Sequence, residues 1–183
     1  MISFKYIILI YIILILVQDK KYISWYPTIP IYPDSNKEAL LVKQYISSNN
    51  LYYKDIFQIT DRSISELFIN YVEEDINELD YIITQPKVIF VIKSLKYLIN
   101  RPRPKQIVPE LEILHSNTAD TPAYPSGHAF QAYYLSTILG RRYPQKKELF
   151  EKLAEECALS RVYAGLHYPS DNIFSKQLVD LLY

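Results

Sequence analysis

Two of the three histidines in this chain of 183 residues lie where the sequence predicts the start or the end of a helix. His128 closes the run Pro125-Ser126-Gly127-His128, in which Ser126 is a favourable residue to begin a helix. Gly127 lets the backbone approach a ligand closely, and the free N–H groups of a helix start attract anions. The run indicates an oxyanion site with an imidazole in its first turn. The alternative is an ordinary serine cap beside an exposed histidine.

The second histidine, His167, lies in a predicted turn between Gly165 and Pro169. Asp171 follows four residues later, at the start of the next predicted helix. That spacing lets the carboxylate accept a hydrogen bond from Nδ1–H, which leaves Nε2 with its lone pair aimed outward. It is the relation of base and orienting acid in nucleophile triads, here with histidine itself as the nucleophile. A simple surface His–Asp hydrogen bond is the alternative.

Three cationic side chains accompany these histidines. Lys96 stands near the end of a predicted helix and Arg103 seven residues later, which is about two helical turns, so both can point the same way. Arg161 comes six residues before His167. Taken alone, a basic helix end is more often compensation of the helix dipole than a binding site.

The three segments are more specific together than apart. In order, they contain Lys96, Arg103, Pro104, Pro125, Ser126, Gly127, His128, Ser160, Arg161, His167 and Asp171. This set resembles the type 2 phosphatidic acid phosphatase superfamily, whose signature reads K-x6-R-P, then P-S-G-H, then S-R-x5-H-x3-D. The resemblance covers about Lys93 to Asn172, and its short intervals look most like the bacterial class A non-specific acid phosphatases.

The resemblance implies a role for each matched residue. It assigns phosphate binding to Lys96, Arg103, Ser126, Gly127 and Arg161. It makes His167 the nucleophile that becomes phosphohistidine, Asp171 the residue that fixes its tautomer, and His128 the acid that protonates the leaving group. It implies no metal and no other cofactor, since the three cations supply the charge. The expected substrate is a small phosphomonoester.

Three other functions remain open. The first is a lipid phosphate phosphatase held near a membrane. The second is a vanadium haloperoxidase, which shares the anion pocket but is a much longer chain. The third is a catalytically inactive anion-binding protein, although the intact set of His128 and His167 argues against it.

Composition limits the remaining possibilities. The 20 basic and 20 acidic side chains balance, so the chain lacks the basic excess of a nucleic-acid-binding protein. Cys157 is the only cysteine, which excludes an internal disulfide and a thiolate metal cluster, and its predicted helix favours a buried position. His115 matches no signature position and is expected in a solvated loop, and Arg101 is expected to orient the loop beside it.

Helix signals predict the fold. Capping boxes at 35–38 and 63–66 each precede apolar runs, and Pro86 suits the first turn of a helix ending near Ile99. Further helices are expected over 126–141 and 146–164, the latter ended by Gly165, and from a Ser170 cap to Leu182. The fold class is therefore all-α, a single-domain helical bundle with the active site at helix ends.

The N-terminus resembles a targeting segment. Lys5 precedes an uncharged apolar run from Tyr6 to Val17, which is short for a membrane span. We expect a signal peptide or signal anchor over 1–21, a Pro-rich extended arm over 22–34 and a helical phosphatase domain over 35–183. The protein would then be secreted or extracytoplasmic, with possible membrane attachment through the leader; the oligomeric state is left open.

Overall fold

The computed structural model describes residues 31–183, which form helices and contain no strand, so the all-α prediction is confirmed. The α-helices are α2 (Ser35–Ser47), α3 (Leu51–Arg62), α4 (Ile76–Thr84), α5 (Pro86–Ile99), α6 (Pro104–Ile107), α7 (Gly127–Arg142), α8 (Lys147–Tyr163) and α9 (Pro169–Leu182). Short 3-10 helices cover Ile64–Leu67, Ile69–Tyr71 and Pro144–Lys146.

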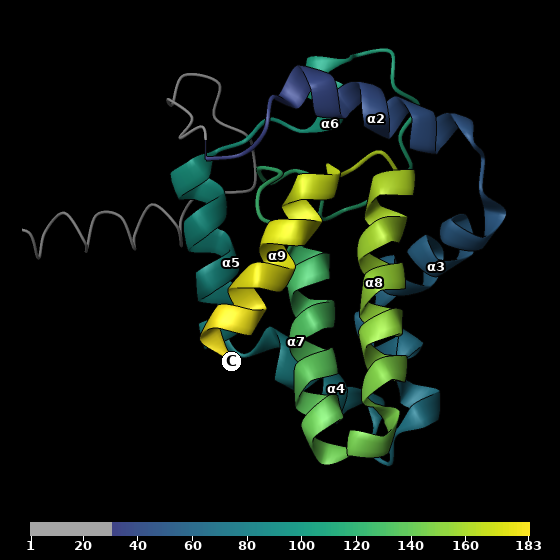
Figure 1. Ribbon diagram of the computed structural model, residues 1–183, viewed down its shortest axis with the longest axis vertical. Coiled ribbons are helices and arrows are strands. Elements are labelled where there is room, and N and C mark those ends of the chain that lie inside the picture. The colour runs from purple at the N-terminus through teal and green to yellow at the C-terminus, as the bar shows by residue number, and fades with distance from the viewer. Residues whose placement is uncertain (1–30) are drawn as a thin grey trace, which may run out of the picture.

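The centre of the bundle is the pair α7 and α8, which lie side by side and have the most extensive contact in the described chain. Helix α9 packs on α7, and α3 packs on α8 (Figure 1). Phe130 and Leu135 of α7 meet Phe150 and Ala154 of α8 in the main apolar core, and all four are fully buried. Burial of these and the other apolar side chains of the core is the main stabilising contribution to the bundle.

One end of the bundle collects the helix termini that matter for the site. The start of α7, the end of α8 and the start of α9 meet there, and α2 and α6 lie across them (Figure 1). A second apolar cluster holds α2 in this position, with Ala39 and Val42 of α2 packed against Val162 and Tyr168. The expectation of an active site at helix ends thus corresponds to a real convergence of helix termini.

Several local predictions are confirmed. Pro86 is in the first turn of α5, and Ser126 caps α7 through its side chain, which accepts from the Ala129 N–H at 3.4 Å. Gly165 follows the end of α8 with a φ of +75°, a conformation that suits glycine. Cys157 is buried.

The helix predicted from the capping box at 63–66 is wrong. Helix α3 ends at Arg62, and short 3-10 turns follow in place of an α-helix. Ser63 is extended and its hydroxyl accepts from the Ser65 N–H at 3.2 Å, while Glu66 pairs with Arg62 at 3.0 Å and does not reach back to Ser63. The serine therefore caps a tight turn and not an α-helix.

Two other predicted helix starts are shifted. Asp34 and not Ser35 caps α2, and α9 begins at Pro169, so Ser170 lies within its first turn. Glu38 and Ser170, which the sequence assigns to local caps, bond each other at the bundle end, where Glu38 Oε1 accepts from the Ser170 N–H at 3.1 Å.

The predicted leader over 1–21 and most of the arm over 22–34 lie outside the described residues. Within residues 31–183, every helix is too short or too polar to cross a membrane.

Candidate active site

A cavity of about 370 Å³ opens at the bundle end where the helix termini meet. Its wall includes Lys96, Arg103, Gly127, His128 and His167, which the sequence had placed in three separate segments. These residues come from α5, from the turn after it, from the start of α7 and from the turn before α9. The fold therefore brings both histidines and two of the predicted cations to a single hollow.

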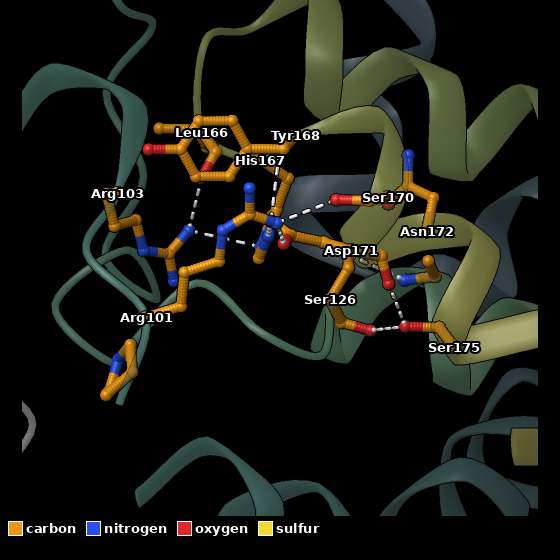
Figure 2. A network of polar contacts seen from close by, with 12 residues as sticks. Arg101, Arg103, Ser126, Leu166, His167, Tyr168, Ser170, Asp171, Asn172 and Ser175 are labelled. Atoms are coloured by element: carbon orange, nitrogen blue, oxygen red, sulfur yellow. Dashed lines mark hydrogen bonds and ion pairs between the residues drawn. The ribbon is translucent and has the colours of Figure 1, made fainter. Parts of the chain in front are cut away.

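His167 is held at both ring nitrogens and is 2% exposed. Its Nδ1 lies 2.9 Å from Asp171 Oδ2, and its Nε2 lies 3.1 Å from Arg103 Nη1 (Figure 2). A guanidinium can only donate, so Nε2 must accept and Nδ1 must carry the proton. The geometry thus fixes the tautomer that leaves the lone pair of Nε2 on the cavity side.

Asp171 is wholly buried and its two oxygens serve different partners. Oδ2 accepts from His167 and from the Tyr168 N–H at 2.9 Å, and Oδ1 accepts from Arg101 at 2.7 Å. Burial raises the pKa of Asp171 to about 6, against the lowering effect of Arg101, the Tyr168 N–H and the more distant cations. Burial therefore disfavours the ionised carboxylate, and the neighbouring cations offset part of that effect.

The cations beside His167 are buried and crowded. Lys96 Nζ donates to the Pro122 carbonyl at 2.5 Å, and Arg103 donates to the carbonyls of Thr121 and Leu166, both at 2.8 Å. Burial, with the nearby guanidiniums, lowers the pKa of Lys96 well below its usual value. Both cations thus bond only neutral acceptors, which are oxygens and the Nε2 of His167, and an arriving anion would relieve their mutual repulsion.

Gly127 closes the cavity beside Lys96. A Cβ at this position would lie 3.5 Å from Ile92 Cγ2 and 3.8 Å from Lys96 Cε, which is ordinary contact. Packing alone therefore does not require a glycine here, and the space beside its backbone belongs to the cavity.

His128 stands on the cavity wall with a side chain that is 14% exposed. Its nearest described carboxylate is Asp61 of α3, with 4.0 Å between Nε2 and Oδ1. Burial lowers the pKa of His128 well below 6.5, and the positive charges of Arg161, Lys96 and Arg103 lower it further. These effects favour the neutral imidazole, and a phosphate dianion that neutralises the cations is expected to favour the protonated form.

Two predicted phosphate ligands lie behind the cavity wall. Arg161 donates to Asp61 at 2.8 Å and to the Ser116 hydroxyl at 3.3 Å, with its guanidinium over the Phe57 ring. Ser126 is fully buried and its hydroxyl is used in capping α7. Their roles in phosphate binding stay predictions, since each would have to exchange a present partner for the ligand.

Sequence reasoning missed Asp61, Ser116 and Glu38. Asp61 bonds Arg161 across 100 residues of sequence, and the Ser116 hydroxyl donates to the same carboxylate at 2.6 Å. No local pattern marks either residue. His115 is exposed and outside this cavity, as expected. Arg101 had been expected to orient a loop, but its side chain contacts Asp171 and is wholly buried.

The described residues offer no alternative metal site. Within 31–183, no group of three or more His, Cys, Asp or Glu side chains is placed to hold a metal ion. The cavity wall carries the cationic and imidazole nitrogens of Lys96, Arg103, His128 and His167, which suit an oxyanion, together with Asp120 and neutral polar side chains.

Comparison with known proteins agrees with the geometry. A search of curated proteins finds no match to this chain. The family model of the PAP2 superfamily matches residues 80–177, which is more than half of the chain and includes both histidines and the three cations described above. The chain therefore belongs to the PAP2 superfamily and is a phosphatase.

Proposed function

We propose that this protein hydrolyses small phosphomonoesters through a phosphohistidine formed on His167, as an acid-phosphatase-like enzyme. The observation that carries the proposal is the state of that imidazole. Its Nε2 holds a lone pair at the cavity wall, Nδ1–H is held by Asp171, and Arg103 and Lys96 stand beside it. Phosphoryl transfer depends mainly on positioning and on charge stabilisation, and this arrangement provides both.

In the first step, the phosphate dianion occupies the cavity and binds Arg103 and Lys96. Arg103 then donates to phosphate oxygens in place of His167 Nε2, which lies 3.1 Å from its Nη1 in the structure. An arginine fork suits two phosphate oxygens, and the lysine adds a point charge. Substrate binding thus uncovers the nucleophile.

In the chemical step, the Nε2 lone pair of His167 attacks phosphorus in line and forms a P–N bond. The P–O bond to the leaving group breaks, and the leaving oxygen takes that electron pair and a proton from His128. Asp171 stabilises the positive charge that develops on the imidazole of His167.

In the second step, His128 takes a proton from a water molecule, whose oxygen attacks phosphorus. The P–N bond breaks, its electron pair returns to His167, and phosphate leaves. Side-chain cations meet the charge at every stage, so we propose a metal-independent reaction with no cofactor. We also propose that the apolar N-terminal segment exports or anchors the protein, which would place the site outside the cytoplasm.

One observation favours a second candidate, a lipid phosphate phosphatase. The cavity has an apolar side on α5, formed by Ile89, Ile92 and Tyr97. An acyl chain would lie well against this side. The test compares turnover of detergent-dispersed phosphatidic acid with that of a water-soluble phosphomonoester. A kcat/KM that is higher for the lipid would replace the first candidate with the second.

The experiment for the proposed function is hydrolysis of p-nitrophenyl phosphate by the wild type and by His167→Ala, with and without EDTA. We expect metal-independent turnover by the wild type, inhibition by vanadate or phosphate, and loss of about a thousandfold or more in the variant. A quench in alkaline detergent with a 32P-labelled substrate should trap a phosphoprotein that is stable to base and labile to acid, and only in the wild type. Equal turnover by His167→Ala would exclude the nucleophile, and loss of activity in EDTA would exclude the metal-independent reaction.

A further inference from the structure

Arg101 is fully enclosed near the site, with 0% exposure, like the Asp171 carboxylate that it contacts. Its guanidinium donates at 2.7 Å to Asp171 Oδ1 on one side and at 2.7 Å to Glu38 Oε2 on the other (Figure 2 shows the Asp171 side). A buried charge is stable only when it is paired and hydrogen-bonded. Arg101 therefore depends on both carboxylates, and they depend on it.

The same guanidinium is fixed from its faces as well as its edges. It stacks on the Tyr168 ring, with 3.8 Å between the guanidinium carbon and the ring centroid, and lies 4.4 Å from the Tyr32 ring centroid. Its Nη1 also donates to the Ser170 hydroxyl at 2.7 Å. Glu38 accepts from that hydroxyl in turn, at 2.5 Å. The position of Arg101 is thus set by α2, by α9 and by aromatic rings together.

This fixed cation controls the orientation of Asp171. The carboxylate gives Oδ1 to Arg101 and Oδ2 to His167, so it cannot rotate without losing one of them. A continuous chain of contacts then runs from Glu38 through Arg101 and Asp171 to the nucleophile. Its first member lies on α2, before the residues that the family model matches.

We propose that Arg101, held by Glu38 of α2, is a positioning residue that keeps Asp171 ionised and correctly oriented behind His167. The inference rests on the proposed function, because it concerns the reactivity of His167. It adds α2 to the elements on which catalysis depends. The competing interpretation is that the Arg101–Glu38 pair only ties α2 to α9 and stabilises the fold.

The two interpretations differ in their effect on the ionisation of Asp171. The charged or titratable groups around this carboxyl are Arg101, His167, Lys96 and Arg103, with Glu38 beyond Arg101 and the phenols of Tyr124 and Tyr168, whose pKa values burial raises. Burial already raises the pKa of Asp171 to about 6. Loss of the Arg101 charge would raise that pKa further, whereas loss of the Glu38 charge would leave Arg101 less neutralised and lower it.

The test follows the acid limb of kcat/KM for p-nitrophenyl phosphate in Arg101→Met, Arg101→Lys and Glu38→Gln. We expect the midpoint of the limb to move up by about one pH unit or more in Arg101→Met and to move down in Glu38→Gln. Arg101→Lys should hold the midpoint near that of the wild type, since it keeps the charge. Inhibition by phosphate should change less than about threefold in all three, because none of these residues lines the cavity.

A matched control is the pair of Arg142 and Glu74, which bond at 2.6 Å at the far end of α7. Arg142→Met and Glu74→Gln should change the unfolding temperature without moving the acid limb. If Arg101→Met does not fold, Glu38→Gln and Arg101→Lys still decide the question. A midpoint that stays fixed in folded Arg101→Met and Glu38→Gln, or that moves the same way in both, would overturn the proposal.

A second readout does not require turnover. The 13C carboxyl resonance of Asp171, assigned with Asp171→Asn, reports the pKa directly. We expect it to rise in Arg101→Met and fall in Glu38→Gln relative to the wild type. An inactive wild-type protein would contradict the proposed function, whereas unchanged carboxyl titrations would contradict the role of Arg101 whether or not the protein turns over.

Discussion

The surroundings of the two histidines differ more than their similar places at helix ends suggest. His167 is 2% exposed and bonded at both nitrogens, and its partner Asp171 is itself bonded on every side. His128 has a side chain that is 14% exposed, and the nearest described carboxylate is 4.0 Å away. One imidazole is held by buried hydrogen bonds, and the other faces the cavity with a single, more distant carboxylate beside it.

The difference fits the roles proposed for the two histidines. A nucleophile that attacks in line gains most from a fixed orientation, and buried contacts hold His167 in this way. A proton donor must serve the leaving oxygen in one step and a water molecule in the next, so His128 benefits from a less rigid position. The histidine with the proposed role of nucleophile is therefore held more tightly than the one with the proposed role of proton donor.

The largest effect is expected from substitution of Asp171, which holds His167. Asp171→Asn keeps the size of the side chain but cannot act as an anionic acceptor for His167 Nδ1–H, so the tautomer and the developing charge are no longer supported. By analogy with triads we expect kcat for p-nitrophenyl phosphate to fall about a thousandfold or more. The unfolding temperature should also fall, because Arg101 loses a buried partner. A kcat within tenfold of the wild type would show that His167 does not need fixing.

Substitution of His128, the more exposed histidine, should have an effect on kcat/KM that depends on the substrate. In His128→Ala, alkyl phosphates lose their proton donor, and we expect their kcat/KM to fall about a hundredfold. The p-nitrophenolate group leaves without a proton, so its loss should be about tenfold or less. A plot of log kcat/KM against leaving-group pKa measures this as a steeper slope. Equal losses for all substrates would contradict the acid role.

The pH dependence of kcat/KM should also distinguish the contributions of Asp171 and His128. Asp171 must be ionised, and its pKa is raised to about 6, so kcat/KM should fall as the pH drops below about 6 for every substrate. His128 must be protonated as the acid, and its pKa is lowered, so activity on alkyl phosphates should also fall as the pH rises. The alkyl phosphate profile should be a bell on the acid side of neutrality. Its high-pH limb should be weak or missing for p-nitrophenyl phosphate.

The smallest effect is expected at Asp61, which now neutralises Arg161. Asp61→Asn should free that guanidinium for the ligand and tighten phosphate inhibition by about threefold to tenfold. Asp55→Asn, an exposed change on the same helix, is the matched control and should leave the inhibition constant unaltered. Weaker inhibition in Asp61→Asn would mean that the carboxylate orients Arg161 for the ligand and does not compete with it.

What the sequence predicts well is local. The spacing of His167 and Asp171, the cap at Ser126 and the end of α8 at Gly165 depend on neighbours within a few residues, and the structure has them. Lys96 also reaches the cavity because a continuous helix sets its direction.

What the sequence could not predict joins distant segments. The local sequence around Glu38 indicates a capping-box residue, yet Glu38 bonds Arg101, which is 63 residues away. Arg161 was expected among the phosphate ligands, and the structure places it against Asp61 from α3. Both outcomes depend on which elements pack together at the bundle end, and single-sequence patterns contain no signal for that pairing.

The bond from Glu38 to Ser170 joins residues that are 132 positions apart. A chain growing on the ribosome exposes α2 well before α9, which carries the partner of Glu38, has been translated. The surroundings proposed for the nucleophile are therefore completed only once α9 has been made. Phosphate release by a nascent chain would report that α2 and α9 have met.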